Sequence, residues 1–132
     1  MSILSTLPSF LAYLLGALAC LGLFVMVYVH LTPFSEIKLI RSGNHAAATA
    51  LVGALLGYAL PLSSAIAHSV TLRDMIIWAL IGLIAQYAAH LCTRLIIPTI
   101  KQDIDNNNQA IGTLSAGISV VLGLINAACM VY

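Results

Sequence analysis

The sequence has 132 residues, of which 7% are charged and 61% are apolar, and its mean hydropathy is +1.06. Soluble domains carry roughly 25% charged residues, so this composition excludes an ordinary soluble domain and indicates an integral membrane protein. The formal net charge is only +1. Nucleic-acid binding requires a basic face, so we expect the lipid bilayer as the surroundings and no nucleic-acid partner.

Charged residues fall in clusters that leave four apolar stretches, each long enough for the ~20 residues that a transmembrane helix needs. We expect helices that span the membrane at about residues 9–31, 45–69, 75–96 and 110–131. The first stretch lacks the basic start of a signal peptide, so we expect it to be retained as a helix.

Two segments between the spans carry most of the polar residues. Residues 34–42 mix charged and apolar side chains, which is typical of a short helix at the level of the lipid headgroups. Residues 99–109 are the most polar stretch and are expected to form a loop. Asn44 and Asn108 stand just before the second and fourth spans, where an asparagine side chain can cap the first turn of a helix.

Small residues recur at intervals of four in the second and fourth spans, and these rows include Gly53, Gly57 and Gly117. In lipid, small residues let two helix backbones approach closely and gain van der Waals contact. We therefore expect these three glycines to serve helix packing, with the second span against the fourth.

The two halves of the chain repeat the same order of features. Each half has a span, a proline, a charged loop, an asparagine cap and a span rich in small residues. We predict an all-α polytopic protein whose four transmembrane helices arise from a parallel duplicated helical hairpin. The single membrane domain, 1–132, would hold repeat 1 at about 9–69 and repeat 2 at about 75–132.

The positive charges predict the orientation of the protein in the membrane. Four Lys and Arg residues lie in or near the first and third loops, whereas the second loop has only Arg73. Since cytoplasmic loops carry the excess of Lys and Arg, we expect the first and third loops in the cytoplasm and both termini in the periplasm.

Four polar residues are candidates for a path or a binding site. Gln86 and Asn126 are amides deep in apolar spans; they either form bonds between helices or line a polar path. Glu36 and Asp103 occupy nearly equivalent places in the two halves. They either bind a cation at the cytoplasmic mouth or are solvated charges of the loops.

The histidines also allow two interpretations. His30, His45, His68 and His90 lie near the predicted membrane boundaries. Imidazole can relay protons or bind metals, but no pair has the spacing of four residues that a helical metal site uses. Histidines that bond to water or headgroups are the simpler explanation, and we predict no metal site.

Catalysis and cofactor binding receive no support from the sequence. It contains no phosphate-binding loop, no zinc-protease motif and no carboxylate inside a span. The three cysteines have no partner at a motif spacing, which favours free thiols. We therefore expect no catalytic residue and no cofactor.

The segments 43–57 and 108–130, with their paired asparagine motifs, resemble the YjfL-like family, and the resemblance covers essentially the whole chain. This family consists of small four-helix proteins of the bacterial inner membrane, built from a duplicated two-helix unit and without an established activity. The resemblance therefore implies a bacterial plasma membrane location, and it offers no catalytic residue to carry over to this chain.

Two classes of function fit these observations. The first is an oligomeric channel or transporter for ions or small solutes, made of identical chains with Glu36, Asp103, Gln86 and Asn126 along its path. The second is a scaffold or envelope-stress component without transport activity, which recruits a cytoplasmic protein through residues 34–42 and 99–107. A wet axis lined by the two amides would favour transport, and a dry axis would favour the scaffold.

Overall fold

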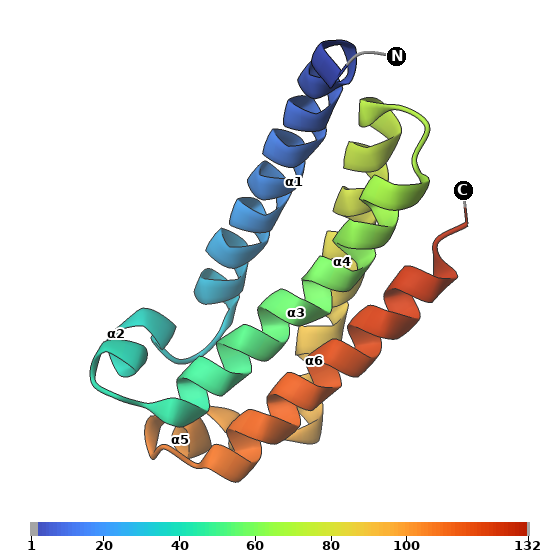
Figure 1. The fold of residues 1–132 in the computed structure, drawn as a ribbon. Coiled ribbons are helices and arrows are strands. Elements are labelled where there is room, and N and C mark those ends of the chain that lie inside the picture. The colour runs from blue at the N-terminus through green and yellow to red at the C-terminus, as the bar shows by residue number, and fades with distance from the viewer. Residues whose placement is uncertain (1–2, 132) are drawn as a thin grey trace.

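The computed structural model describes residues 3–131, and within this range the chain forms helices and no strands. The helices are α1 (Ile3–Leu31), α2 (Glu36–Arg41), α3 (His45–His68), α4 (Leu72–Ile96), α5 (Ile100–Asp105) and α6 (Gln109–Cys129). The four long helices form an elongated bundle. The short helices α2 and α5 lie at one end of it, and the turn between α3 and α4 lies at the other, near the start of α1 (Figure 1).

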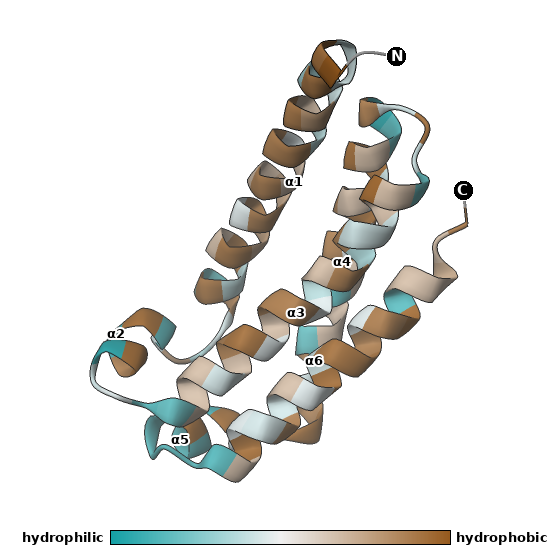
Figure 2. Cartoon of the chain, viewed as in Figure 1, coloured by the Kyte–Doolittle hydropathy of each residue, from teal (hydrophilic) through white to brown (hydrophobic). Residues whose placement is uncertain are grey.

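The four long helices are each long and apolar enough to cross a membrane. Apolar residues cover α1 along its length, and polar residues gather at the end that carries α2 and α5 (Figure 2). The expected spans correspond to these helices, although α1 begins at Ile3 rather than near residue 9. Four apolar helices in one bundle make this a polytopic all-α membrane protein.

The segment expected to be a polar loop contains the helix α5. Its buried residues, Ile100 and Ile104, lie one turn apart and face the bundle, while the polar residues between them face outward. This apolar pair holds α5 against a small cluster of buried residues that includes Phe34 and Ala47. A single turn of apolar contact is therefore enough to make a helix of this stretch.

The two short helices end in the same way. Gly43 and Asn107 adopt left-handed backbone conformations, with φ of 88° and 58°, which close the last helical turn. The residue after each one caps the next long helix. The Asn44 side chain accepts a hydrogen bond from the backbone N–H of Ala47 at 2.8 Å, and the Asn108 side chain accepts one from Ile111 at 3.4 Å.

The most extensive helix contact in the bundle joins α3 and α6, as the small residues predict. A Cβ atom at Gly53 would lie 2.3 Å from the Cα of Ala116, and one at Gly123 would lie 2.0 Å from the carbonyl oxygen of Gly57. Only glycine fits such close backbone approaches. By contrast, a Cβ at Gly117 would meet no atom within 4 Å, so this residue does not take part in the contact.

Aromatic side chains join α1 to α3 and α4. The ring of Phe24 stacks on Tyr58 at 4.7 Å and on Tyr87 at 5.4 Å between ring centroids. The hydroxyl of Tyr58 donates to the carbonyl of Ala79, and that of Tyr87 donates to the carbonyl of Phe24. Each hydroxyl thus bonds a backbone carbonyl of a neighbouring helix, which fixes the register of the three helices.

The halves α1–α3 and α4–α6 share the order long helix, short helix, long helix, and they share the turn that precedes the last helix. This order agrees with the predicted duplication. The packing of the two halves differs. Helix α1 contacts α3 and α4, whereas its counterpart α4 contacts α1, α3 and α6. Duplication of an ancestral hairpin therefore stays a prediction.

Candidate functional site

The two buried amides form hydrogen bonds between helices. The Nε2 atom of Gln86, on α4, donates to the carbonyl of Ser119 on α6 at 2.9 Å. The Nδ2 atom of Asn126, on α6, donates back to the carbonyl of Gly82 on α4 at 3.0 Å. These reciprocal bonds hold α4 and α6 together, which is the simpler of the two roles that the sequence allows for them.

The carbonyl oxygen of the Gln86 side chain lies buried without a hydrogen-bond partner among residues 3–131. The same side chain lies so close to Gly57 that a Cβ there would be 2.6 Å from its amide nitrogen. Gln86 is therefore packed tightly among α3, α4 and α6. Gln86 and Asn126, the candidate path residues along the axis, thus belong to a tightly packed helix contact in the single chain.

Glu36, at the start of α2, is the most unusual ionisable residue, because only 1% of its surface is exposed. Its Oε1 atom accepts a hydrogen bond from the hydroxyl of Thr32 at the end of α1. Burial raises the pKa of the Glu36 carboxyl, and the hydrogen bond from Thr32 opposes this increase only in part. Among residues 3–131, the ion pair that the structure shows joins Lys101 to Asp105 and leaves Glu36 without a cation.

Asp103 has the equivalent bond but a different environment. The hydroxyl of Thr99 donates to its Oδ2 atom at 2.8 Å, four residues away along the chain, as Thr32 does to Glu36. Asp103 is only half-buried and its hydrogen bond is exposed to water. The structure therefore does not bring the two carboxylates into one site, and only Glu36 is withdrawn from water.

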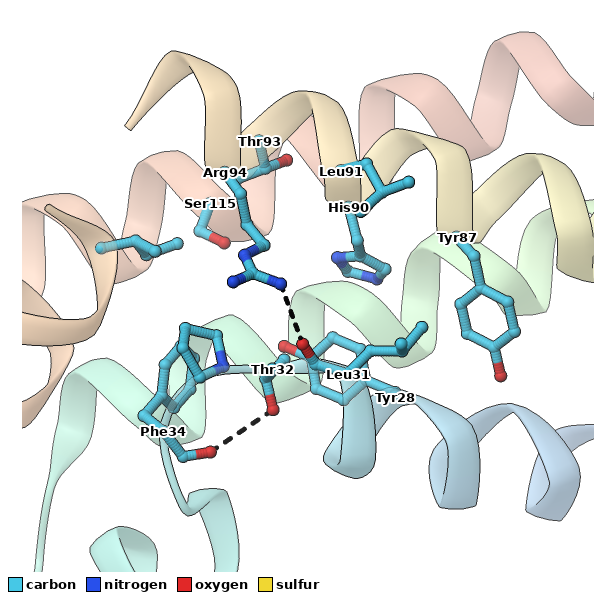
Figure 3. A pocket seen from close by; sticks show the side chains of 12 residues that line it. Tyr28, Leu31, Thr32, Phe34, Tyr87, His90, Leu91, Thr93, Arg94 and Ser115 are labelled. Atoms are coloured by element: carbon cyan, nitrogen blue, oxygen red, sulfur yellow. Dashed lines mark hydrogen bonds between the residues drawn. The ribbon is translucent and has the colours of Figure 1, made fainter. Parts of the chain in front are cut away.

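A cavity of about 30 Å³ lies between the C-terminal ends of α1 and α4, beside the turn that follows α1 and the start of α5. This volume suffices for one or two water molecules and excludes larger solutes. Figure 3 shows side chains from α1, α4 and α6 converging on it. Its polar lining comprises Tyr28, Thr32, Tyr87, His90, Thr93, Arg94 and Ser115.

His90 contributes a ring nitrogen at this cavity that forms no hydrogen bond. Its Nε2 atom is buried and has no hydrogen-bond partner in the described part of the chain. Its ring lies 4.6 Å from that of Tyr28 and 6.1 Å from that of Phe24. His90 is therefore half-buried, with its Nε2 atom withdrawn from water between the rings of α1 and the cavity.

The other three histidines are exposed, as the simpler of the two interpretations predicts. The Nδ1 atoms of His30 and His68 lie 2.6 and 3.0 Å from carbonyl oxygens one helical turn earlier, in exposed positions. His45 is exposed at the start of α3. Among the four histidines, only His90 has a buried ring nitrogen beside this cavity.

Thr32 connects the cavity to the buried carboxylate. It lines the cavity with His90, and its hydroxyl donates to Glu36. On the other side, the guanidinium of Arg94 donates to the carbonyl of Leu31 at 3.2 Å (Figure 3). The cavity is thus lined by a proton acceptor, a hydroxyl and a fixed positive charge, and the Thr32 hydroxyl links it to the Glu36 carboxyl, which lies outside the lining.

Sequence reasoning missed Tyr28, Thr32 and Arg94 as members of this site. Tyr28 and His90 are separated by 62 positions, and no local pattern indicates that they meet. One signal was available: a threonine precedes an acidic residue by four positions at the start of both short helices. That spacing places a hydroxyl donor beside each carboxylate.

Comparisons with known proteins agree with this architecture. A family model described as Domain of Unknown Function (DUF350) matches residues 2–130. The inner membrane protein YjfL of Escherichia coli K12, a UPF0719 protein, is 37% identical over 132 residues, which cover all of both chains. The transmembrane protein YshE of Bacillus subtilis strain 168, also a UPF0719 protein, is 34% identical over 119 residues, or 89% of each chain.

No solved structure matches this chain. The family model covers nearly its whole length, and the relatives named above align with most or all of it. Together with four apolar helices, they support a multi-pass protein of the inner membrane. The chain therefore belongs to the DUF350 (UPF0719) family of small helical membrane proteins, to which the sequence motifs pointed.

Proposed function

We propose that this protein is a subunit of an oligomeric channel or transporter for a small ion in the bacterial inner membrane. The observation that carries the proposal is the 1% exposure of Glu36, whose carboxyl is joined through Thr32 to the cavity beside His90. Withdrawing an ionisable residue from water is costly, and such residues commonly mark functional sites. The ion would pass this end of the bundle, not the axis that Gln86 closes.

The proposal includes an oligomer because one four-helix bundle with a packed α3–α6 contact has no room for a wide pore. A groove between α3 and α6 is lined by small residues, among them Ala48, Thr49 and Gly117. Gly117 leaves open space in which a second copy can approach the backbone closely. Substitution of Gly117 by Leu should therefore lower the oligomeric mass measured in detergent, whereas Gly22→Leu, on the open side of α1, should not.

The orientation of the protein remains the one predicted from its positive charges. Lys38, Arg41, Arg94 and Lys101 all belong to the end of the bundle that carries α2 and α5, and Arg73 belongs to the opposite end. With the first of these ends in the cytoplasm, both termini would be periplasmic. The site around Glu36 would then open to the cytoplasm.

The direct test is flux into liposomes that contain the purified protein. Wild type should move at least one small ion faster than liposomes without protein in a panel of protons, Na⁺, K⁺, chloride and a polyamine. Glu36→Gln should abolish that flux, and Asp103→Asn, the equivalent change at a half-buried carboxylate, should not. Absence of flux for every ion, with intact oligomers, would refute the proposal.

A scaffold without transport activity is the second candidate, because the amides of Gln86 and Asn126 close the axis of the single chain. Its cytoplasmic partner would bind residues 34–42 and 99–107, where the ion pair of Lys101 and Asp105 is exposed. Cross-linking in cells from a photoreactive residue at position 101, with position 73 as the control, would test this. A specific protein adduct at 101 alone, without ion flux, would favour the scaffold.

A further inference from the structure

We propose that the ion is a proton, and that His90, one cavity water, Thr32 and Glu36 form a short proton relay. The inference rests on the proposed function and deepens it by naming the ion and the groups that carry it. The relay lies at the end of the bundle that holds α2 and α5 and runs from His90, which is half-buried, to Glu36, which is buried.

The size of the cavity selects the proton among small ions. A space of about 30 Å³ holds one or two water molecules. A hydrated alkali cation or a polyamine does not fit, and a dehydrated cation would require several oxygen ligands around one point. The guanidinium of Arg94, which lines the same cavity, would also repel any resident metal cation.

The buried Nε2 atom of His90 requires a partner, since a polar atom that has lost water and gained no hydrogen bond is costly. A water molecule in the adjoining cavity provides one. The same water can donate to the Thr32 hydroxyl, because Thr32 lines the cavity and uses its own proton to bond Glu36. A continuous chain of exchangeable protons thus connects His90 to Glu36.

Each transfer in this chain conserves protons. An incoming proton reaches the cavity water, which as hydronium gives it to the Nε2 lone pair, and the resulting imidazolium later returns it to the water. The hydronium so formed passes a proton to the Thr32 oxygen while the original hydroxyl proton of Thr32 moves to the Glu36 carboxylate. The net result is one proton taken up from outside and one neutral carboxylic acid at Glu36, with the water, His90 and Thr32 unchanged after the hydroxyl rotates back.

The charges around His90 give the relay its direction. The titratable or charged groups facing it are Tyr28 from α1 and Tyr87 and Arg94 from α4, with Glu36 from α2 beyond Thr32. The lining residues from α5 and α6, Ile100 and Ser115, do not titrate. An imidazolium therefore has a like charge one turn away and a carboxylate ahead, so the proton moves toward Glu36.

Glu36 can release the proton to water from the outer side of α2. It lines a surface concavity together with Lys38 and Arg41, which are exposed. These two cations attract hydroxide and buffer anions that accept protons. Glu36 thus borders a concavity that opens to the aqueous phase, although only 1% of the residue is exposed.

The first test is independent of transport. Glu36 is the only glutamate in the sequence, so labelling glutamate with ¹³C at the carboxyl gives one resonance that needs no assignment. In nanodiscs, this resonance should titrate in two steps, because two groups that share protons titrate as a pair. His90→Gln should reduce the curve to a single step. A curve that His90→Gln leaves unchanged would overturn the relay.

The second test measures proton flux in liposomes under a potential set by valinomycin. Thr32→Val, which keeps the shape and removes the hydroxyl, should reduce proton flux by about 100-fold, the size typical of a lost proton-transfer group, while Thr32→Ser should stay within about twofold of wild type. Equal fluxes in the Val and Ser variants would overturn the relay. A two-step titration without flux of any ion would instead refute the proposed function and leave the proton pair standing.

Discussion

The close approach of α6 to α3 at Gly123 predicts a large difference between two identical substitutions on one helix. In α6, a methyl group at Gly123 would lie 2.0 Å from the carbonyl oxygen of Gly57, whereas one at Gly117 would meet no atom within 4 Å. Backbone cannot rotate away as a flexible side chain can. Gly123→Ala therefore requires α3 and α6 to separate along their main contact.

The expected magnitude follows from comparing the two alanine variants. Each gains the same helix propensity, about 1 kcal/mol, so this term cancels in the difference between them. Overpacking costs typically 1–3 kcal/mol, and a clash with backbone belongs at the upper end, about 3 kcal/mol. Gly123→Ala should thus be about 3 kcal/mol less stable than Gly117→Ala, a factor above ~100 in the unfolding equilibrium constant.

Unfolding by SDS in mixed micelles, followed by circular dichroism, measures this difference. Gly22→Ala on α1, where the added methyl group also meets open space, serves as a second control. Measured on the monomer, without the second copy proposed to pack at Gly117, it should be as stable as Gly117→Ala. If Gly123→Ala equals the two controls in stability, the close approach of α3 and α6 is wrong, and with it the packing that holds the bundle.

Three further predictions concern hydrogen bonds and a buried charge. Gln86→Leu removes the bond to the carbonyl of Ser119 and should cost about 0.6–1.7 kcal/mol of unfolding free energy in mixed micelles. Asn44→Ala removes the cap of α3 and the bond to the carbonyl of Ile104, and should cost about 1–2 kcal/mol and speed hydrogen exchange in the first turn of α3. Because the pKa of Glu36 is raised on folding, the unfolding free energy should fall as pH rises from about 4.3 through the folded-state pKa, and Glu36→Gln should remove this slope.

Each of these predictions has a matched control. Asn108→Ala removes a longer cap bond without an equivalent link to another helix, so it should cost less than Asn44→Ala. Asp103→Asn should leave the pH slope of stability in place. Equal costs for the two asparagines, no cost for Gln86→Leu, or a slope that survives in Glu36→Gln would each contradict the bonding described.

The sequence was sufficient for the spans and for the main helix contact. Runs of about 20 apolar residues specify transmembrane helices almost alone, since a bilayer leaves few other structures possible. Rows of small residues around Gly53 and Gly57 identified the faces of α3 and α6 that approach each other. The local turn chemistry at Asn44 and Asn108 located the starts of these helices within one residue.

The site was less accessible, because burial depends on neighbours that are distant in the chain. Glu36, beside Lys38, has the pattern of a solvated charge, yet α2 folds so that its carboxyl turns toward Thr32. Membership of His90 in the site requires that the ends of α1 and α4 meet, which no periodicity in either helix indicates. Gln86 and Asn126 were identified as polar residues deep in the spans. Whether such an amide bonds a carbonyl or lines a path depends on how the helices pack, which the sequence does not specify.

The central claim is that polar residues at the α2 end carry ions while the axis amides hold the bundle together. The most direct measurement compares Glu36→Gln with Gln86→Leu for both SDS unfolding and flux per folded subunit in liposomes. We predict that Gln86→Leu loses stability and keeps its flux, whereas Glu36→Gln keeps its stability at neutral pH and loses its flux. Loss of flux in Gln86→Leu together with normal flux in Glu36→Gln would contradict the account and return the path to the axis.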